Sequence, residues 1–415
     1  MESYAPLLAE PRFQRLWSAR VISRFGSALG YVVLIWYTYA ETSSALAVVY
    51  VGLADFVPTI LVGLFSGALV DRYERRSVIV LSTLARSAAM GALALSLDLL
   101  GFHLELIVGA CVLFSLCATF FGPASQALLP EITATEHLDR ANGLFESTES
   151  IVGIAGSALA GGLIVTVGAV PSLGVDAVAY LVAAVLIALI GGAAILPGDA
   201  AREAPILAQV REALGYLRGA IGLLELTVAT LIENFLFGFV LTFVVVYVSD
   251  SLHGTALVYG ALEALLAAGW GVGGVLVSPL RLTRHTGRLA IASTIGLGLG
   301  TVALVLAPVA PLALPVFLGV GVLQGMANVA WLSTVQAMVP GPLQGRYFAL
   351  DNALSYAAIP AAQIAGGLLI LTRGLSFTFL VAGAGLCLAG LGFLALPDLR
   401  RIGYDPRPGA APANS

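Results

Sequence analysis

Residues 46–70, LAVVYVGLADFVPTILVGLFSGALV, form an apolar run that ends in the charged stretch DRYERR at 71–76. A second apolar run, SVIVLSTLARSAAMGALALSLDLL, follows at 77–100. Each run is long enough to cross a bilayer, since a membrane helix needs about 20 mostly apolar residues. Only helices and closed barrels satisfy their backbone polar groups within lipid. The stretch therefore predicts two membrane helices joined by a tight charged loop.

The same pattern continues along the whole chain. Of its 415 residues, 59% are hydrophobic and 11% are charged, and the mean hydropathy is +0.96. A soluble domain has about 25% charged residues, so a water-soluble protein is excluded. The sequence predicts an all-α integral membrane protein with twelve transmembrane helices, and its first run is a retained span and not a signal peptide. The predicted spans are 15–40, 46–70, 77–100, 105–129, 140–168, 171–196, 222–249, 256–280, 289–308, 311–338, 346–371 and 375–396.

Several functional classes are disfavoured by composition. The net charge of −4 and the lack of a basic tail argue against a nucleic-acid partner. The three cysteines and four histidines are far apart, so neither a metal site nor a Ser-His-Asp triad is expected, and no enzyme activity or cofactor is predicted. All 20 basic residues are arginine, and the missing lysine removes the usual phosphate-binding loop of ATP-driven pumps.

The arginines also predict the orientation of the chain. Sixteen precede the first span, lie in alternate loops or follow the last span, whereas the opposite loops hold only Arg373. This bias places both termini in the cytoplasm of a multi-pass protein of the cell membrane. Arg20, Arg24 and Arg86 lie inside spans. The sixteen are Arg12, Arg15, Arg72, Arg75, Arg76, Arg140, Arg202, Arg211, Arg218, Arg281, Arg284, Arg288, Arg346, Arg400, Arg401 and Arg407.

The longest polar stretch, 197–221, predicts the division of the chain. Its apolar residues recur at helical spacing opposite arginines, which indicates an amphipathic helix on the cytoplasmic membrane surface. It joins two predicted six-helix bundles, 1–196 and 222–396, and the polar tail 397–415 is expected to be disordered. The apolar residues are Ile206, Leu207, Val210, Leu214 and Leu217.

An internal repeat relates the two predicted bundles. QALLP at 126–130 matches QAMVP at 336–340, and AGGLI at 160–164 matches AGGLL at 365–369. Two pseudo-symmetric halves of this kind are typical of transporters that bind substrate near the midplane.

The charged loop after the second span carries a motif, GALVDRYERR at 67–76. Glycine allows two helices to approach closely, and a fixed acid can pair with the following arginines or with helix ends. An alternative is that the arginines only anchor the loop on the cytoplasmic side. The stretch resembles the loop signature of the major facilitator superfamily, Gly-x-Leu-x-Asp-Arg-x-x-Arg-Arg. The matching residues are Gly67, Leu69, Asp71, Arg72, Arg75 and Arg76.

Further stretches resemble the bacterial macrolide-efflux and enterobactin-exporter branch of that superfamily. They are residues 13–17, 23–26, 121–131 and 138–142. The resemblance implies the major facilitator fold, with the loop motif latching the two halves in the outward-facing state. Three positions depart from the pattern: Ser27 follows Gly26 where relatives often carry aspartate, Gly156-Ser157 replaces a Gly-Pro, and Ser278 replaces an aspartate in the second-half loop.

Charges inside spans are functional candidates, because each costs at least about 2.5–3.5 kcal/mol at the bilayer centre. Arg24, Asp55 and Glu233 fall near mid-depth, and Glu149 and Glu263 are intermediate. The resemblance places Arg24 and Glu233 on helices that line the transport cavity. Glu233, beside Asn234, is predicted to titrate during transport. Arg24 is predicted either to tune the pKa of Glu233 or to bind an anionic group of the substrate. The alternative is a static ion pair of Arg24 with Asp55 or Glu149.

Two further sets of residues are candidates. Glu146 shares a helical face with Glu149 and is equivalent to Asp351 in the repeat, so Glu146 and Asp351 are predicted to belong to the cytoplasmic gate. Gln126, Gln324 and Asn328 are amides within spans that can face a cavity or bond between helices.

Together these features predict a secondary active transporter. The leading hypothesis is proton-coupled efflux of hydrophobic or amphipathic small molecules, such as drugs or a siderophore, by alternating access. An uptake carrier of the same fold and a transport-silent membrane sensor are the alternatives. The expected partners are a small-molecule substrate, protons and the lipid bilayer, and the chain is expected to be a monomer.

Overall fold

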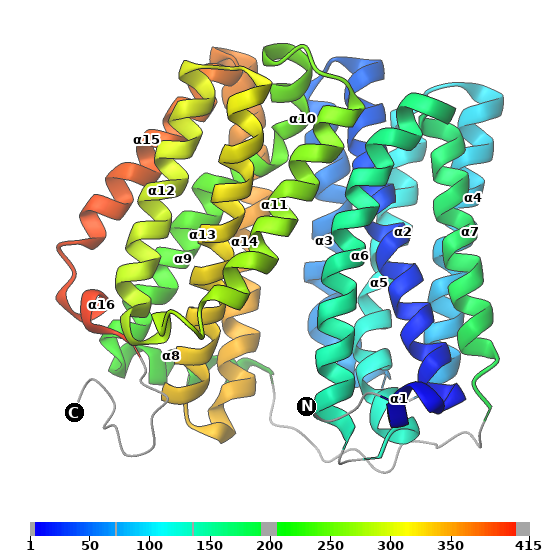
Figure 1. Cartoon of the computed structure of the whole chain (residues 1–415), viewed down its shortest axis with the longest axis horizontal. Helices are drawn as coiled ribbons and strands as arrows, with labels where there is room; N and C mark the ends of the chain where they lie inside the picture. The colour runs from blue at the N-terminus through cyan, green and yellow to red at the C-terminus, as the bar shows by residue number, and fades with distance from the viewer. Residues whose placement is uncertain (1–4, 71–72, 135–136, 192–205, 404–415) are drawn as a thin grey trace. The chain divides into compact units, whose positions relative to one another are not determined.

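The computed structural model describes residues 5–70, 73–134, 137–191 and 206–403, which form helices and no strand (Figure 1). The long helices of the first half are α2 (Pro11–Thr42), α3 (Ala45–Val70), α4 (Arg75–Leu100), α5 (Leu104–Ile132), α6 (Leu138–Val167) and α7 (Ala169–Ala188). Those of the second half are α9 (Ile221–Thr242), α11 (Ala256–Leu276), α12 (Thr286–Leu306), α13 (Ala310–Met338), α14 (Gly341–Arg373) and α15 (Leu375–Phe393).

The predicted all-α membrane class is confirmed. The described residues contain 11 helices that are long and apolar enough to cross a membrane. The twelfth predicted span, 346–371, lies within α14, whose apolar described part is limited to Ala357–Arg373.

The chain divides into two compact units. Unit 1 comprises Met1–Ala201 together with Thr255–Ala264, the beginning of α11, and unit 2 comprises Arg202–Gly254 and Leu265–Ser415. In unit 1, α4 packs on α5 and α7, while α2 packs on α6 and α7 and α3 packs on α5. In unit 2, α12 packs on α13 and α15, and α9 packs on α14 and α15.

Tight connections keep successive helices antiparallel. Gly101, Gly168 and Gly374 end α4, α6 and α14 with φ values of +82°, +94° and +82°. Glycine adopts this left-handed region without the steric penalty of a Cβ atom, so the next helix begins within a few residues.

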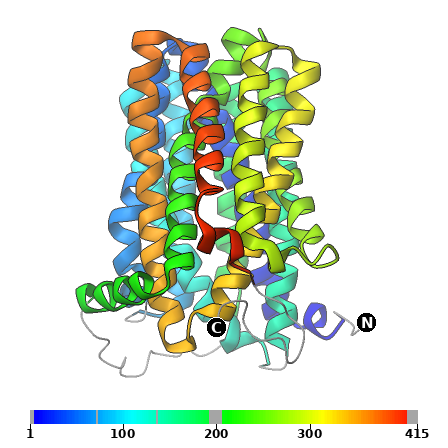
Figure 2. The same ribbon diagram turned by 90° about the vertical axis from the view of Figure 1, so that its left-hand side faces the viewer.

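Two short helices lie at the ends of the long helices of unit 2 (Figure 2). The helix α8 (Ile206–Gly219) packs on α9 and α14, with Leu217 buried and the Tyr216 hydroxyl donating to the Met338 carbonyl at 2.9 Å. The expectation of disorder from 397 onward is wrong for 397–403. There α16 (Pro397–Arg401) packs on α9, because the Leu399 amide donates to the Glu225 carboxylate at 2.6 Å and the Leu399 side chain is fully buried.

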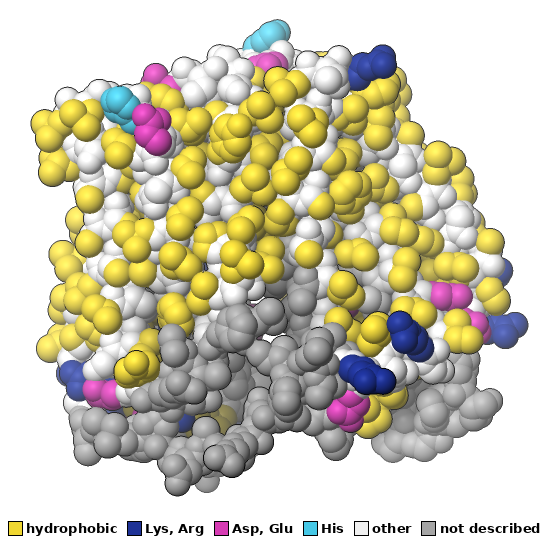
Figure 3. Space-filling view, turned by 180° about the vertical axis from the view of Figure 1, so that it is seen from behind, with side chains coloured by type: hydrophobic (Ala, Val, Ile, Leu, Met, Phe, Trp, Pro, Cys, Tyr) yellow, Lys and Arg dark blue, Asp and Glu magenta, His cyan; other side chains and the backbone are white. Residues whose placement is uncertain are grey.

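The surface matches a membrane environment. In the face drawn in Figure 3, hydrophobic side chains cover the middle of the described helices and charged side chains gather toward their ends. Many of the exposed side chains are large and apolar, including Leu81, Leu99, Val275 and Leu388. Such a surface is stable in contact with lipid, where exposed leucine carries no hydration cost.

Candidate functional site

Unit 2 contains a cavity of about 390 Å³ that gathers five of the predicted site residues. It is lined from α9, α11, α12, α13 and α14. The five predicted residues in its wall are Glu233, Asn234, Gln324, Asn328 and Asp351. They come from three helices that are far apart in the sequence, so the cavity is a product of the tertiary fold.

Helical spacing explains why these side chains share one space. On α13, Gln324 and Asn328 are four residues apart, and Trp331 follows one turn later on the same face. On α14, Asp351 and Ser355 have the same four-residue spacing. The remaining wall is mainly apolar, so a few polar groups face an otherwise hydrophobic space, which is the usual composition of a small-molecule site.

Glu233 is held by a hydroxyl and not by a cation. Thr294 of α12 donates to the Glu233 carboxylate at 2.5 Å, and the same hydroxyl contacts the Ala290 carbonyl at 2.9 Å. Asp351 is buried and bonded to Ser355, but its Oδ1 atom has no hydrogen-bond partner among the described residues. None of the described residues that line the cavity is basic. A proton or a donor on a bound molecule can therefore satisfy these carboxyl groups.

The structure corrects the predicted environment of Arg24. Glu149 pairs with Arg20 at 2.5 Å, and the Arg20 guanidinium also lies 4.1 Å from the centre of the Phe145 ring. Arg24 is exposed and lies over Gly153 of α6, and it forms no ion pair with any described acid. The alternative of a static pair between Arg24 and Glu149 is wrong, because Arg20, one helical turn earlier, occupies that position.

The other predicted residues of unit 1 lie in several different surroundings. Asp55 of α3 is half-buried, and its backbone carbonyl accepts a hydrogen bond from Ser115 of α5. Gln126 and Glu146 are exposed. Glu263 is half-buried in the part of α11 that belongs to unit 1.

The loop motif is described only in part. Gly67 lies in α3, but its surroundings, together with Asp71 and Arg72, lie outside the described residues. Arg75 forms an ion pair with Glu131 at the end of α5, and Arg76 donates to the Ala188 carbonyl at the end of α7. Both arginines thus bind helix ends of unit 1, where the negative end of a helix dipole favours a cation.

Sequence reasoning missed the role of Arg86 and Asp176. Arg86 of α4 is 3% exposed and Asp176 of α7 is 1% exposed, which makes them the two most buried charged residues among those described. From the sequence alone, Arg86 is identified only as an arginine inside a span, and Asp176 is not selected. The signal that could have found Arg86 is the rule that selected Arg24, namely the cost of a charge deep in a span.

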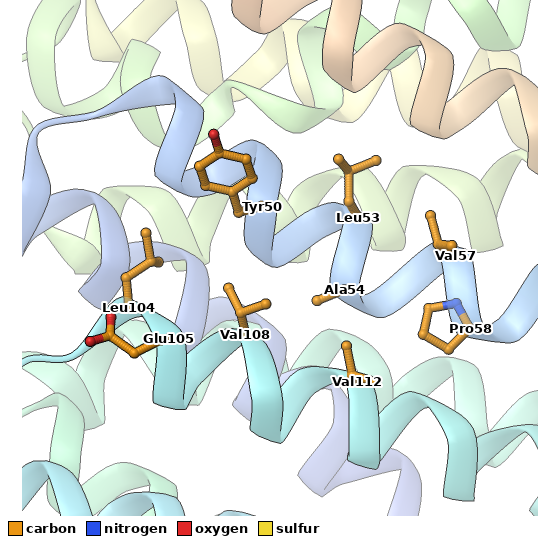
Figure 4. A pocket seen from close by; sticks show the side chains of 9 residues that line it. All are labelled: Tyr50, Leu53, Ala54, Val57, Pro58, Leu104, Glu105, Val108 and Val112. Atoms are coloured by element: carbon orange, nitrogen blue, oxygen red, sulfur yellow. The ribbon is translucent and has the colours of Figure 1, made fainter.

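A larger cavity in unit 1 has a different character. It has a volume of about 650 Å³ and is lined from α3 by Tyr50, Leu53 and Val57 and from α5 by Val108 and Val112 (Figure 4). Glu105 is the one charged residue among the described residues of its wall. Because convergent polar groups are missing there, it is a weaker candidate for a specific site than the cavity of unit 2.

Long apolar helices that enclose a polar cavity define a multi-pass integral membrane transporter. The model of the transmembrane secretion effector family, within the major facilitator superfamily, matches residues 1–407, and the chain belongs to this family. Multidrug efflux pump Tap of Mycobacterium tuberculosis (strain ATCC 25618 / H37Rv) is 27% identical over 406 residues, which cover 94% of each chain. Macrolide efflux protein A of Streptococcus pyogenes is 24% identical over 381 residues, which cover 90% of this chain and 92% of that protein.

Solved structures support the same fold. A bacterial homologue of the iron transporter ferroportin in the inward-facing state superposes with a TM-score of 0.71 and 19% identity, covering 95% of this chain and 99% of the other. A bacterial homologue of the human lysosomal transporter Spinster gives a TM-score of 0.71 with 14% identity, over 96% and 99% of the two chains. At this identity the similarity concerns the fold alone.

Proposed function

We propose that this transporter is a proton-coupled exporter of hydrophobic or amphipathic small molecules in the cell membrane. It works as a monomer by alternating access, with both termini in the cytoplasm. The observation that carries the proposal is the cavity of unit 2, in which Glu233 and Asp351 face amide groups and apolar walls, with no cation among the described lining residues.

The cavity suits a neutral or cationic substrate. Trp270 and Trp331 provide aromatic surface for apolar rings or for a cation, and Gln324 and Asn328 provide hydrogen-bond donors and acceptors. Ionised carboxyl groups attract a cation, whereas an anionic substrate would face like charges without a basic partner in the cavity wall. The names of Tap and Macrolide efflux protein A are consistent with a substrate of this class and with export.

Glu233 is proposed to exchange a proton for the substrate. In the empty site Thr294 donates to the ionised carboxylate, and a proton taken up from outside neutralises it. A substrate that enters from the cytoplasmic side restores the charged form as the proton leaves. Binding of proton and substrate to one carboxyl group is mutually exclusive, and this exclusion couples the two movements.

The test is transport by the purified full-length chain in liposomes with an imposed pH gradient and a fluorescent amphipathic cation as the probe. Glu233→Gln should abolish accumulation driven by the gradient but retain exchange of probe across the membrane at equal pH. Glu105→Gln is the matched control, because the Glu105 side chain is 78% exposed at the start of α5.

Three outcomes would contradict the proposal. Gradient-driven accumulation by Glu233→Gln at the wild-type rate would remove Glu233 from coupling. Accumulation by the wild type that a protonophore does not reduce would remove the proton as driving ion. Accumulation only with the opposite direction of the gradient would indicate an uptake carrier.

A further inference from the structure

A buried cation lies at the crossing of four helices in unit 1. The Arg86 guanidinium donates to the Ser23 hydroxyl at 3.2 Å, to the Ser27 hydroxyl at 2.9 Å and to the Tyr180 hydroxyl at 2.8 Å. It also lies 4.1 Å from the ring centre of Tyr180 and 4.5 Å from that of Phe114. Neutral hydroxyl groups and aromatic rings hold this side chain in place, but they do not neutralise its charge.

A buried carboxyl group without hydrogen bonds lies nearby. Both oxygens of Asp176 lack a hydrogen-bond partner among the described residues. The group packs against the backbone of α2, where a Cβ atom at Gly26 would stand 2.5 Å from its Oδ1 atom and Gly30 leaves even less space. An ionised carboxylate in this position would lose its hydration without replacement, which costs several kcal/mol.

Asp55 is a second carboxyl group within reach of the same cation. The Asp55 carbonyl accepts a hydrogen bond from Ser115, the residue after Phe114, whose ring centre lies 4.5 Å from the Arg86 guanidinium. Neither Asp55 nor Asp176 forms an ion pair with Arg86 in the described part of the chain. The titratable groups that face the two carboxyls from the packed helices are Tyr31 of α2, Cys111 of α5 and Tyr180 of α7. Tyrosine and cysteine are uncharged in their usual states at neutral pH, so Arg86 is the one cation acting on either described carboxyl.

The charge count then requires one proton. With both carboxyls ionised, one arginine leaves the buried cluster with a net charge of −1, and a second cation is missing from the described surroundings. With one carboxyl protonated, the cluster is neutral. Of the two, Asp176 is the more buried and accepts no hydrogen bond from a described donor, which favours its neutral form, while half-buried Asp55 balances Arg86.

We propose that Asp55, Arg86 and Asp176 form a proton-binding site of unit 1 that holds one proton, resident on Asp176. Arg86 is the positioning residue, because its charge fixes how many protons the two carboxyls retain. Release of the proton converts the Asp176 carboxyl to a carboxylate and leaves the cluster with one negative charge. A part for this proton in the transport cycle rests on the proposed function, whereas its presence in the folded protein does not.

Infrared spectroscopy of the purified full-length chain in nanodiscs tests the site directly. A protonated carboxyl group gives a C=O stretching band that shifts in D₂O. The difference spectrum between the wild type and Asp176→Asn should show one such band, lost in the variant. Asp55→Asn should lose the same band, because Asp176 must then ionise to balance Arg86. Arg86→Gln should raise the band toward twice its intensity, and Glu105→Gln should leave it unchanged.

Each outcome decides the proposal. A band of wild-type intensity in Asp176→Asn shows that Asp176 carries no proton and overturns it. Loss of the band in Asp176→Asn but not in Asp55→Asn overturns the charge count. If Asp176→Asn does not fold, Asp55→Asn and Arg86→Gln still test the count. If transport is driven by protons but the band is missing, the proposed function stands and the inference is wrong. If the band is present but transport is not driven by protons, the inference stands and the proposed function is wrong.

Discussion

The two units carry their buried charges in contrasting ways. In unit 1 the Arg86 cation is enclosed by hydroxyl groups and rings, with Asp176 sealed against the backbone of α2. In unit 2 Glu233 and Asp351 face a cavity of about 390 Å³, and the part of its wall that the structure describes holds no basic residue. A carboxyl group that has a resident cation needs no ligand, whereas one that faces a cavity can be neutralised by a proton or by a bound molecule. Under the two proposals above, unit 2 binds the substrate at an open cavity and unit 1 holds a proton in a sealed cluster.

The first long helix of each unit shows how the sequence produces this contrast. On α2, Gly26 and Gly30 remove side-chain volume and let the Asp176 carboxyl approach the backbone. On α9, Glu233 and Asn234 line the cavity. One helix therefore closes space with glycine, and the other provides polar groups around an open space.

The largest expected effect comes from removing the cation of unit 1. Arg86→Ala leaves the Asp55 carboxylate without its counter-charge and three hydroxyl groups without their donor, so we expect a loss of about 3–5 kcal/mol in unfolding free energy. The readout is the thermal unfolding temperature of the purified chain in detergent. Arg400→Ala serves as the control, because Arg400 is exposed and makes one long contact, 3.5 Å, with the Leu394 carbonyl. An equal unfolding temperature for Arg86→Ala and the wild type would show that the cluster is not a balanced charge site.

Much of the fold is predictable from hydropathy, since each span is a local property of the chain. The predicted span 105–129 and helix α5, Leu104–Ile132, differ by three residues or fewer at each end. The Arg20–Glu149 pair is not predictable in this way. Arg20 and Arg24 are one turn apart on α2, and only the packing of α2 on α6 decides which of them reaches Glu149.

The candidate site was predictable residue by residue but not as a group. Glu233, Gln324 and Asp351 are each unusual in an apolar span, and this marks them individually. Their meeting in one cavity depends on the packing of α9, α13 and α14, which no local pattern contains. The isolation of Asp176 likewise depends on its distance from donors on other helices, which its place in the sequence does not reveal.

An intermediate effect, on the rate of transport, is expected from removing the hydrogen bond between Thr294 and Glu233 in unit 2. Thr294→Val removes the hydrogen bond to Glu233, and a bond to a charged group contributes about 1.5–3 kcal/mol. We expect kcat/KM for probe export to fall by about tenfold, which corresponds to about 1.4 kcal/mol. The measurement is the initial rate of probe transport in liposomes over a range of probe concentrations.

Thr301→Val is a matched control for this variant. Thr301 lies on the same helix, is equally buried, and bonds to the Leu297 carbonyl at 2.8 Å. Both substitutions replace a hydroxyl group by a methyl group. An equal loss of transport in both would therefore indicate a general effect on α12 and not the loss of the hydrogen bond from Thr294 to Glu233.

The smallest expected effect lies outside both polar sites. Tyr216→Phe removes the hydrogen bond from α8 to the Met338 carbonyl, so we expect a loss of about 1 kcal/mol in unfolding free energy. Burial raises the pKa of Tyr216 above its ordinary value of 10.0, so the hydroxyl keeps its proton and the bond is complete at neutral pH. Because the folded-state pKa exceeds the unfolded value, this stabilisation is lost only as the pH rises through the folded-state value. The difference in unfolding free energy between Tyr216→Phe and the wild type should therefore be constant between pH 6 and about 9.

Met338 ends α13, the helix that carries Gln324 and Asn328, so the variant also tests whether a small loss of stability on that helix alters transport. An unchanged range of exported probes would tie substrate choice to the cavity wall, and a changed range would show that the docking of α8 helps to shape the cavity.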